Sequence, residues 1–136
     1  MGIKITFPGN LKVNAEINGR VIPTDQTLSA GGDGTAPAPF EYFISSLGTC
    51  AGIYVLSFCK TRGIPTDGIE IDQNIEYDPV RQRIGKVVLD IQLPADFPEK
   101  YKEAVIRAAN QCAVKKYLQE PFEVETIATV NEMAMS

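Results

Sequence analysis

The feature that most constrains this chain is the stretch of residues 42–59 (YFISSLGTCAGIYVLSFC), which carries no charged side chain. Residues 40–62 contain no proline, while Pro39 precedes them and Gly63 and Pro65 follow. Proline at the start and glycine after the end are typical of helix boundaries, so we expect one long helix here. The stretch has the length of a membrane span, but serines, a threonine and two glycines dilute it. We therefore expect a helix buried on most sides of a water-soluble domain.

The segments around this helix alternate between strand and turn signals. Asn18-Gly19 is a strong hairpin signal, and residues 29–39 hold three glycines and two prolines, which predicts a flexible loop. From the periodicity we expect strands within 3–23, strands at 69–75 and 84–93, helices at 99–110 and 111–118, and a last strand at 122–128. This order predicts a single domain over residues 1–136, of class α+β with antiparallel sheets around the long central helix.

An uncharged helix of this length needs apolar cover on most of its circumference. One chain of 136 residues with two modest further helices covers it only in part. An intimate homodimer, in which two such helices pack together between two sheets, solves this burial problem. We therefore expect a homodimer.

The composition removes several classes of function. The chain has no histidine, which excludes Ser-His-Asp and Cys-His catalysis and histidine-ligated metals. Its three cysteines are too few for a four-cysteine zinc site, and we expect no metal and no cofactor. The net charge of −4 argues against nucleic acid as a partner, and we expect no membrane partner either. The N-terminus lacks a secretory pattern, so we expect a cytoplasmic protein with free thiols.

The three cysteines are the candidate reactive groups. Cys50 lies in the middle of the predicted helix between small residues, either as a small core side chain or as a thiol that a ligand can approach. Cys59 is nine residues on, half a turn out of phase, and so faces away from Cys50. Cys112 stands at the junction of two helical segments, where amide groups favour a thiolate or where the side chain is simply buried.

Two segments resemble the motifs of one known family. Residues 36–50 (APAPFEYFISSLGTC) are similar to the P-x-P-x-E-(x)6-G-x-C segment of OsmC-like proteins, and residues 111–118 (QCAVKKYL) to that family's second-cysteine motif. Ala113 stands where that motif usually has proline, and the place of Glu41 matches the less characterised OsmC-like branch rather than the organic-hydroperoxide-resistance branch. The resemblance covers nearly the whole chain and implies an α+β fold in a swapped homodimer.

The resemblance also implies an activity, the thiol-dependent reduction of organic hydroperoxides. Cys50 would be the peroxidatic cysteine and Cys112 the resolving cysteine, and an external dithiol would reduce the pair. Arg20 would hold the Cys50 thiolate, with Lys60 or Arg62 as other sources of charge, and Glu41 would orient the guanidinium. The apolar surround of the substrate would come from Phe40, Phe43 and Tyr54.

Other interpretations stay open at this point. A non-catalytic protein of the same fold would sense redox state or bind a small ligand, and a hot-dog-like thioesterase would use a helix carboxylate such as Glu41. Glu41 lies nine residues before Cys50, about 13.5 Å along the helix axis and on the opposite face. It therefore serves a site on the second subunit, or it is a favourable charge at the start of its own helix.

Overall fold

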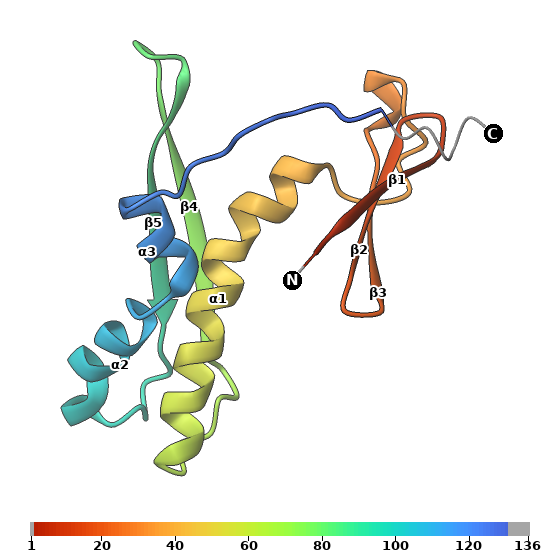
Figure 1. Ribbon diagram of the computed structural model, residues 1–136. Coiled ribbons are helices and arrows are strands. Elements are labelled where there is room, and N and C mark those ends of the chain that lie inside the picture. Colours follow the sequence, from red (N-terminus) through yellow and green to blue (C-terminus); the bar gives the residue numbers. More distant parts are fainter. Residues whose placement is uncertain (1, 131–136) are drawn as a thin grey trace.

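The computed structural model describes residues 2–130, in which a three-stranded N-terminal sheet stands beside a helical body (Figure 1). The sheet consists of β1 (Lys4–Gly9), β2 (Lys12–Ile17) and β3 (Arg20–Thr24), all antiparallel. Asn18 and Gly19 both have positive φ, 51° and 74°, as the predicted two-residue hairpin turn requires.

The register of this sheet gives it one apolar face. Ile5, Ala15 and Ile22 lie in one cross-strand row, and Ile17 pairs with Arg20 in the row beside it. Because side chains alternate between faces along a strand, Arg20 lies on the same face as Ile22. That face is uncovered in the single chain: 52% of Ile5 and 38% of Ile22 are exposed.

The glycine-rich loop before the long helix is ordered around Asp25, which is fully buried. Its carboxylate accepts hydrogen bonds from the backbone N–H groups of Gln26 and Thr35, at 2.7 and 3.0 Å, and from the Thr35 hydroxyl at 2.7 Å. The loop also contains a short 3-10 turn, Leu28–Ala30. The segment is a loop, as predicted, and composition did not reveal the buried carboxylate that gathers its N–H groups.

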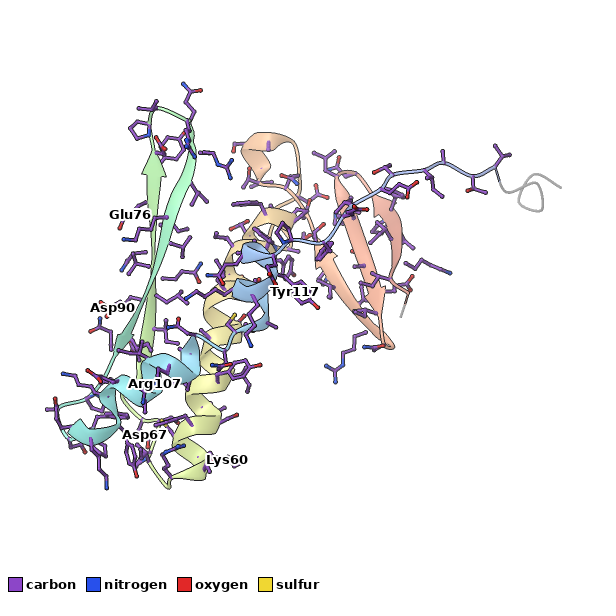
Figure 2. The ribbon with its side chains drawn as sticks, turned by 60° about the vertical axis from the view of Figure 1, so that its left-hand side comes forward. Lys60, Asp67, Glu76, Asp90, Arg107 and Tyr117 are labelled. Atoms are coloured by element: carbon purple, nitrogen blue, oxygen red, sulfur yellow. The ribbon has the colours of Figure 1, made fainter. Side chains whose placement is uncertain are left out.

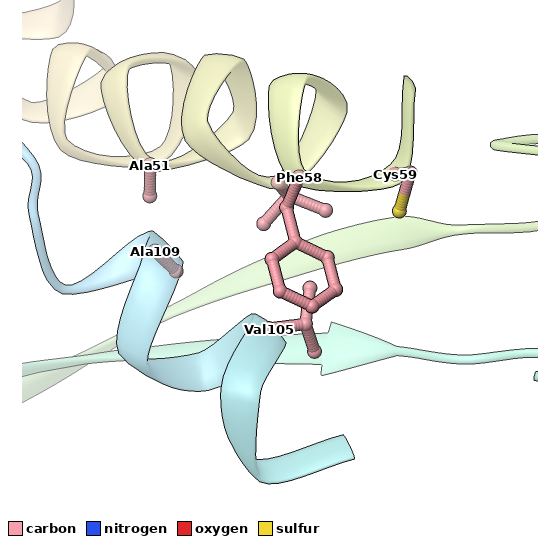
Figure 3. Close-up of a cluster of buried hydrophobic side chains, with 6 residues drawn as sticks. Ala51, Phe58, Cys59, Val105 and Ala109 are labelled. Carbon is pink, nitrogen blue, oxygen red and sulfur yellow. The ribbon is translucent and has the colours of Figure 1, made fainter. Parts of the chain in front are cut away.

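The helical body is built on a second hairpin, as predicted. The strands β4 (Glu70–Asp78) and β5 (Arg83–Gln92) pair antiparallel, and α1 (Pro39–Thr61) packs against β4. A 3-10 turn at Glu99–Tyr101 leads into α2 (Lys102–Ala109), and α3 (Ala113–Gln119) follows; both helices pack on α1. The core lies between α1 and α2 (Figure 3), and its buried members are Ala51, Val55, Phe58, Cys59, Val105 and Ala109.

In the single chain the long helix is buried on one side only, so the expected burial on most sides is not reached within one chain. Its core side carries Leu47, Ala51 and Val55, whereas 53% of Ile53 and 43% of Leu56 are exposed on the other side. Within the described residues α1 is also the one helix long and apolar enough to span a membrane by length and composition. That criterion is weak, because the core helix of a water-soluble protein meets it equally.

The predicted last strand is absent from the described residues. Residues 121–130 form no ladder hydrogen bonds and run away from α3 toward the N-terminal sheet (Figure 1). Phe122, Val124 and Ile127 are largely exposed along this segment. The alternation that predicted a strand is real, but a strand is defined by its pairing, and residues 121–130 pair with no strand of the described chain.

Candidate functional site

Cys50 lies where α1 meets the first residues of α3. The backbone N–H groups of Val114 and Ala113 face its sulfur, and the Cys112 side chain lies beside it. The Val114 N–H contributes most to holding the pKa of the Cys50 thiol below its ordinary value, and partial burial opposes the shift. A thiolate is the reactive form of cysteine, so this arrangement favours a nucleophile at Cys50.

Cys112 lies beside Cys50 but in a drier setting, with 2% of the residue exposed. Burial raises the pKa of its thiol, although the N–H groups of Lys115 and Val114 oppose this. Its Sγ lies 3.9 Å from the carbonyl oxygen of Leu47, to which the thiol donates. The side chain of Cys112 is therefore buried, and the backbone N–H groups at the start of α3 do not outweigh the effect of that burial on its pKa.

Cys59 is separated from this pair, as its helical phase predicted. It is fully buried in the core between α1 and α2, and burial raises the pKa of its thiol. Arg62 stacks over the Phe58 ring at 3.7 Å and lies 5.5 Å from the Tyr101 ring. This holds Arg62 at the far end of α1, where Lys60 also lies (Figure 2), so neither supplies charge to Cys50 in this chain.

The structure does not bring Arg20 to Cys50 within one chain. Arg20 begins β3 at the tip of the N-terminal hairpin and is exposed. Among the described residues it takes part in no ion pair and no side-chain hydrogen bond. Its side chain shares the uncovered apolar face of the sheet, so a partner that covered this face would meet Arg20.

Glu41 acts at the start of its own helix. Its Oε1 accepts a hydrogen bond of 2.9 Å from the backbone N–H of Ala38, the residue before α1. This is one half of a capping box, in which the glutamate three residues into the helix bonds back to the first N–H. The observed contact corresponds to the helix-terminus role, and no contact joins Glu41 to the two cysteines of its own chain.

An apolar pocket of about 450 Å³ adjoins the thiol pair. Its lining shares Ala113 and Val114 with the Cys50 site and includes Phe43, Ser46, Tyr117, Leu118, Pro121, Phe122 and Val124. Phe43 lines it, and the Phe40 ring lies tilted by 44° against Phe43, with ring centroids 5.7 Å apart. Tyr54 lies one helical turn beyond Cys50 and does not line this pocket. Tyr117 projects from α3 toward the N-terminal sheet (Figure 2).

Sequence reasoning missed the residue that ties α1 to the hairpin. Gln73 of β4 stands in the inward row with Ile71 and Ile75, and its amide bonds to the backbone of α1. The signal was present, because a lone polar residue in an apolar row needs buried partners. Within residues 2–130, no group of three or more metal-ligating side chains gathers anywhere.

Comparisons with known proteins agree with this architecture. The OsmC-like protein family model matches residues 32–127. One solved structure comes from Psychrobacter arcticus 273-4 and is described as an osmotic stress induced and detoxification response protein. It matches with a TM-score of 0.64 and 24% sequence identity, and the match covers 84% of this chain and 85% of the Psychrobacter chain. A second, from structural genomics, has a TM-score of 0.62 at 20% identity, over 89% of this chain and 91% of its own. A search of curated proteins finds no match. The structural likeness shows the fold.

Proposed function

The chain belongs to the OsmC-like protein family, and from this premise we propose that it is a thiol-dependent peroxidase that reduces organic hydroperoxides. The family includes peroxidases. The observation that carries the proposal is the pairing of two unlike thiols: Cys50, whose pKa is lowered by backbone N–H groups, and Cys112, whose pKa burial raises. A peroxidatic cysteine must be a thiolate, and a resolving cysteine must wait beside it as a thiol.

In the proposed chemistry, the bonds that form and break lie on these two thiols, the hydroperoxide and an external reductant. The Cys50 thiolate attacks one peroxide oxygen, so that an S–O bond forms and the O–O bond breaks; the alkoxide takes up a proton and leaves as the alcohol. The Cys112 thiol then attacks the sulfenic sulfur, forming the disulfide and releasing water. A dithiol gives two electrons and two protons, restores both thiols and becomes a disulfide itself.

The apolar pocket supports an organic substrate. Its lining beyond Ser46 consists of apolar and aromatic side chains, and it begins at the residues whose N–H groups face Cys50. An apolar tail gains free energy there by leaving water, whereas hydrogen peroxide gains nothing from the pocket. We therefore propose that kcat/KM is higher for an aromatic or alkyl hydroperoxide than for hydrogen peroxide.

We further propose that the site is completed in a homodimer in the cytoplasm. The exposed side of α1 is uncharged from Tyr42 to Ser57, and the N-terminal sheet has an apolar face without cover. A second copy that exchanged these surfaces would bury both and would bring Arg20 against the partner's helix. Sedimentation velocity tests the dimer, and a monomer at micromolar concentration would contradict it.

Subunit mixing tests the role of Arg20. An Arg20→Ala chain and a Cys50→Ser chain are each expected to be inactive as homodimers. If Arg20 serves the partner's thiol, a co-refolded heterodimer regains one intact site and about half the activity per dimer. No recovery in a verified heterodimer would show that Arg20 does not act across the interface.

The central experiment treats the reduced protein with one equivalent of cumene hydroperoxide and maps disulfides by peptide mass. We expect one bridge, Cys50–Cys112, and consumption of the peroxide in stopped-flow traces. Cys112→Ser should allow a single turnover and stop at the sulfenic acid of Cys50, which a second equivalent of the hydroperoxide should over-oxidise to the sulfinic acid. Cys59→Ser is the matched control and should turn over normally. A dominant bridge to Cys59, or no peroxide consumption with both thiols reduced, would overturn the proposal.

The same pocket also supports a second candidate, a non-catalytic protein that binds a small apolar ligand. Its volume is in the range that suits small organic molecules. Under this alternative, a fluorescent fatty-acid probe binds equally to the Cys50→Ser and unmodified proteins, and neither consumes peroxide. Turnover of cumene hydroperoxide would exclude it.

A further inference from the structure

Gln73 is a polar side chain in an otherwise apolar position. It lies in β4 between Ile71 and Ile75 of the row that faces α1, and Leu89 stands opposite it on β5. The residue is half-buried, and a polar group withdrawn from water in this way requires hydrogen-bonding partners. The central inward position of the hairpin is therefore occupied by a residue that makes a specific polar contact.

That contact is made with one rung of the helix backbone. The Gly48 N–H donates to Gln73 Oε1 at 3.0 Å, and Gln73 Nε2 donates to the Ile44 carbonyl oxygen at 2.6 Å. Ile44 and Gly48 are four residues apart, so these are the two groups that face each other in the helical ladder. The amide thus clamps this rung from outside. Within residues 2–130 these are the side-chain hydrogen bonds that join α1 to the hairpin.

The helix has a glycine where the clamp needs room. A Cβ placed on Gly48 would lie 2.5 Å from Gln73 Oε1, well inside contact distance. A Cβ on the next glycine of the helix, Gly52, would make only an ordinary contact of 3.9 Å with Ile71. The two glycines of α1 therefore differ: Gly48 makes space for the Gln73 amide, and Gly52 does not.

The clamp lies beside the thiol site, on the other side of the helix. Gly48 precedes Cys50 by two residues and points about 200° away from it around the axis. In the same turn, Leu47 accepts the Cys112 hydrogen bond. A rotation of α1 by about 10° would move an atom that lies roughly 5 Å from the axis by about 1 Å. Hydrogen bonds to sulfur from fixed backbone N–H groups do not survive such a shift unchanged.

We propose that Gln73 is a positioning residue, which sets the rotation of α1 on the hairpin and so holds the Cys50 sulfur against the N–H groups of Ala113 and Val114. Its effect reaches Cys50 through the helix backbone, because its amide contacts Ile44 and Gly48 rather than the thiol. The role concerns the reactivity of a thiol and holds for any electrophile that Cys50 meets.

The test measures the alkylation of Cys50 by iodoacetamide against pH, followed by peptide mass. Gln73→Leu should fold, because the Ile44 and Gly48 groups can pair with each other in the helix, and circular dichroism checks this. We expect its profile to move to higher pH, with a rate on the acid side lower by roughly five-fold, the scale of one weakened hydrogen bond. Gln92→Leu, which removes an exposed amide bonded to Asp90 on β5, is the matched control and should leave the profile unchanged.

The two glycines provide an independent arm. Gly48→Ala displaces the Gln73 amide and should move the profile as Gln73→Leu does, whereas Gly52→Ala, with the same gain in helix propensity, should not. In the Gln73→Leu background Gly48→Ala should have no further effect, because the group it displaces is gone. An unchanged profile in folded Gln73→Leu, or equal shifts from the two alanines, would overturn the proposal.

Peroxide consumption measured on the same samples separates this inference from the proposed function. An unmoved profile with normal turnover refutes the clamp alone. A moved profile in a protein that consumes no peroxide supports the clamp and refutes the peroxidase.

Discussion

Ala113→Pro removes one backbone N–H from the thiol site and changes little else. Ala113 is the first residue of α3, where an N–H has no partner within the helix and proline is well tolerated. The preceding residue, Cys112, already has φ −50° and ψ 123°, the extended geometry that a following proline requires. The variant should therefore fold normally, and it should gain about 0.4–1 kcal/mol of stability through the lower entropy of its unfolded chain.

The same substitution deletes one of the N–H groups that lower the pKa of the Cys50 thiol. A hydrogen bond to a charged acceptor contributes about 1.5 kcal/mol at the lower end of its range, and about 1.4 kcal/mol corresponds to a tenfold change in an equilibrium. On the acid side of the pH profile the rate is proportional to the thiolate fraction. The alkylation rate of Cys50 should therefore fall up to about tenfold there, and less if water replaces the lost donor.

The assay is the pH profile of Cys50 alkylation, read by peptide mass, with thermal unfolding measured in parallel. Ala113→Ser keeps the N–H and is the matched control, which should retain the original profile. Val114→Pro removes the donor with the largest effect and should shift the profile further to high pH. A folded Ala113→Pro protein with an unchanged profile would refute the assignment of thiolate stabilisation to these backbone groups.

Three further predictions concern the loop and the start of α1. The hydrogen bonds that Asp25 accepts hold its pKa low, so the carboxylate stabilises the folded state fully at neutral pH and this contribution is lost as pH falls through the lowered pKa. Asp25→Asn should therefore lower Tm by several degrees at pH 7. The difference in Tm between the two proteins should shrink below about pH 4. Gly32→Ala should destabilise more severely, since its Cβ would lie 2.2 Å from the Gln26 carbonyl oxygen, and a Tm within one or two degrees of the parent would contradict this packing. Glu41→Gln should lower the free energy of unfolding, measured by chemical denaturation, by less than about 1 kcal/mol, since glutamine can still accept the hydrogen bond from Ala38. The pH profile of Cys50 alkylation should stay unchanged. A shift of that profile would mean that the carboxylate reaches a thiol.

Local patterns predicted most of the elements because each has its own signal in the sequence. The Asn18-Gly19 turn, the proline-bounded helix and the alternation at residues 69–75 all appeared at nearly the expected places. The helical phase of Cys59 correctly placed it away from Cys50. The last strand failed because a strand is defined by its neighbour, and residues 121–130 have none in the single chain.

The sequence by itself narrowed the candidate chemistry: without histidine, and with two cysteines in motifs that resemble those of one family, the candidate reactive groups were Cys50 and Cys112. Their unlike pKa shifts came only from the tertiary structure, since backbone N–H groups outweigh burial at Cys50 and burial outweighs them at Cys112. Periodicity placed Gln73 in the inward row but gave no partner for it. The physical reason is the same in both cases: a hydrogen bond between residues far apart in sequence depends on how helices and strands pack, and local patterns carry no information about that distance.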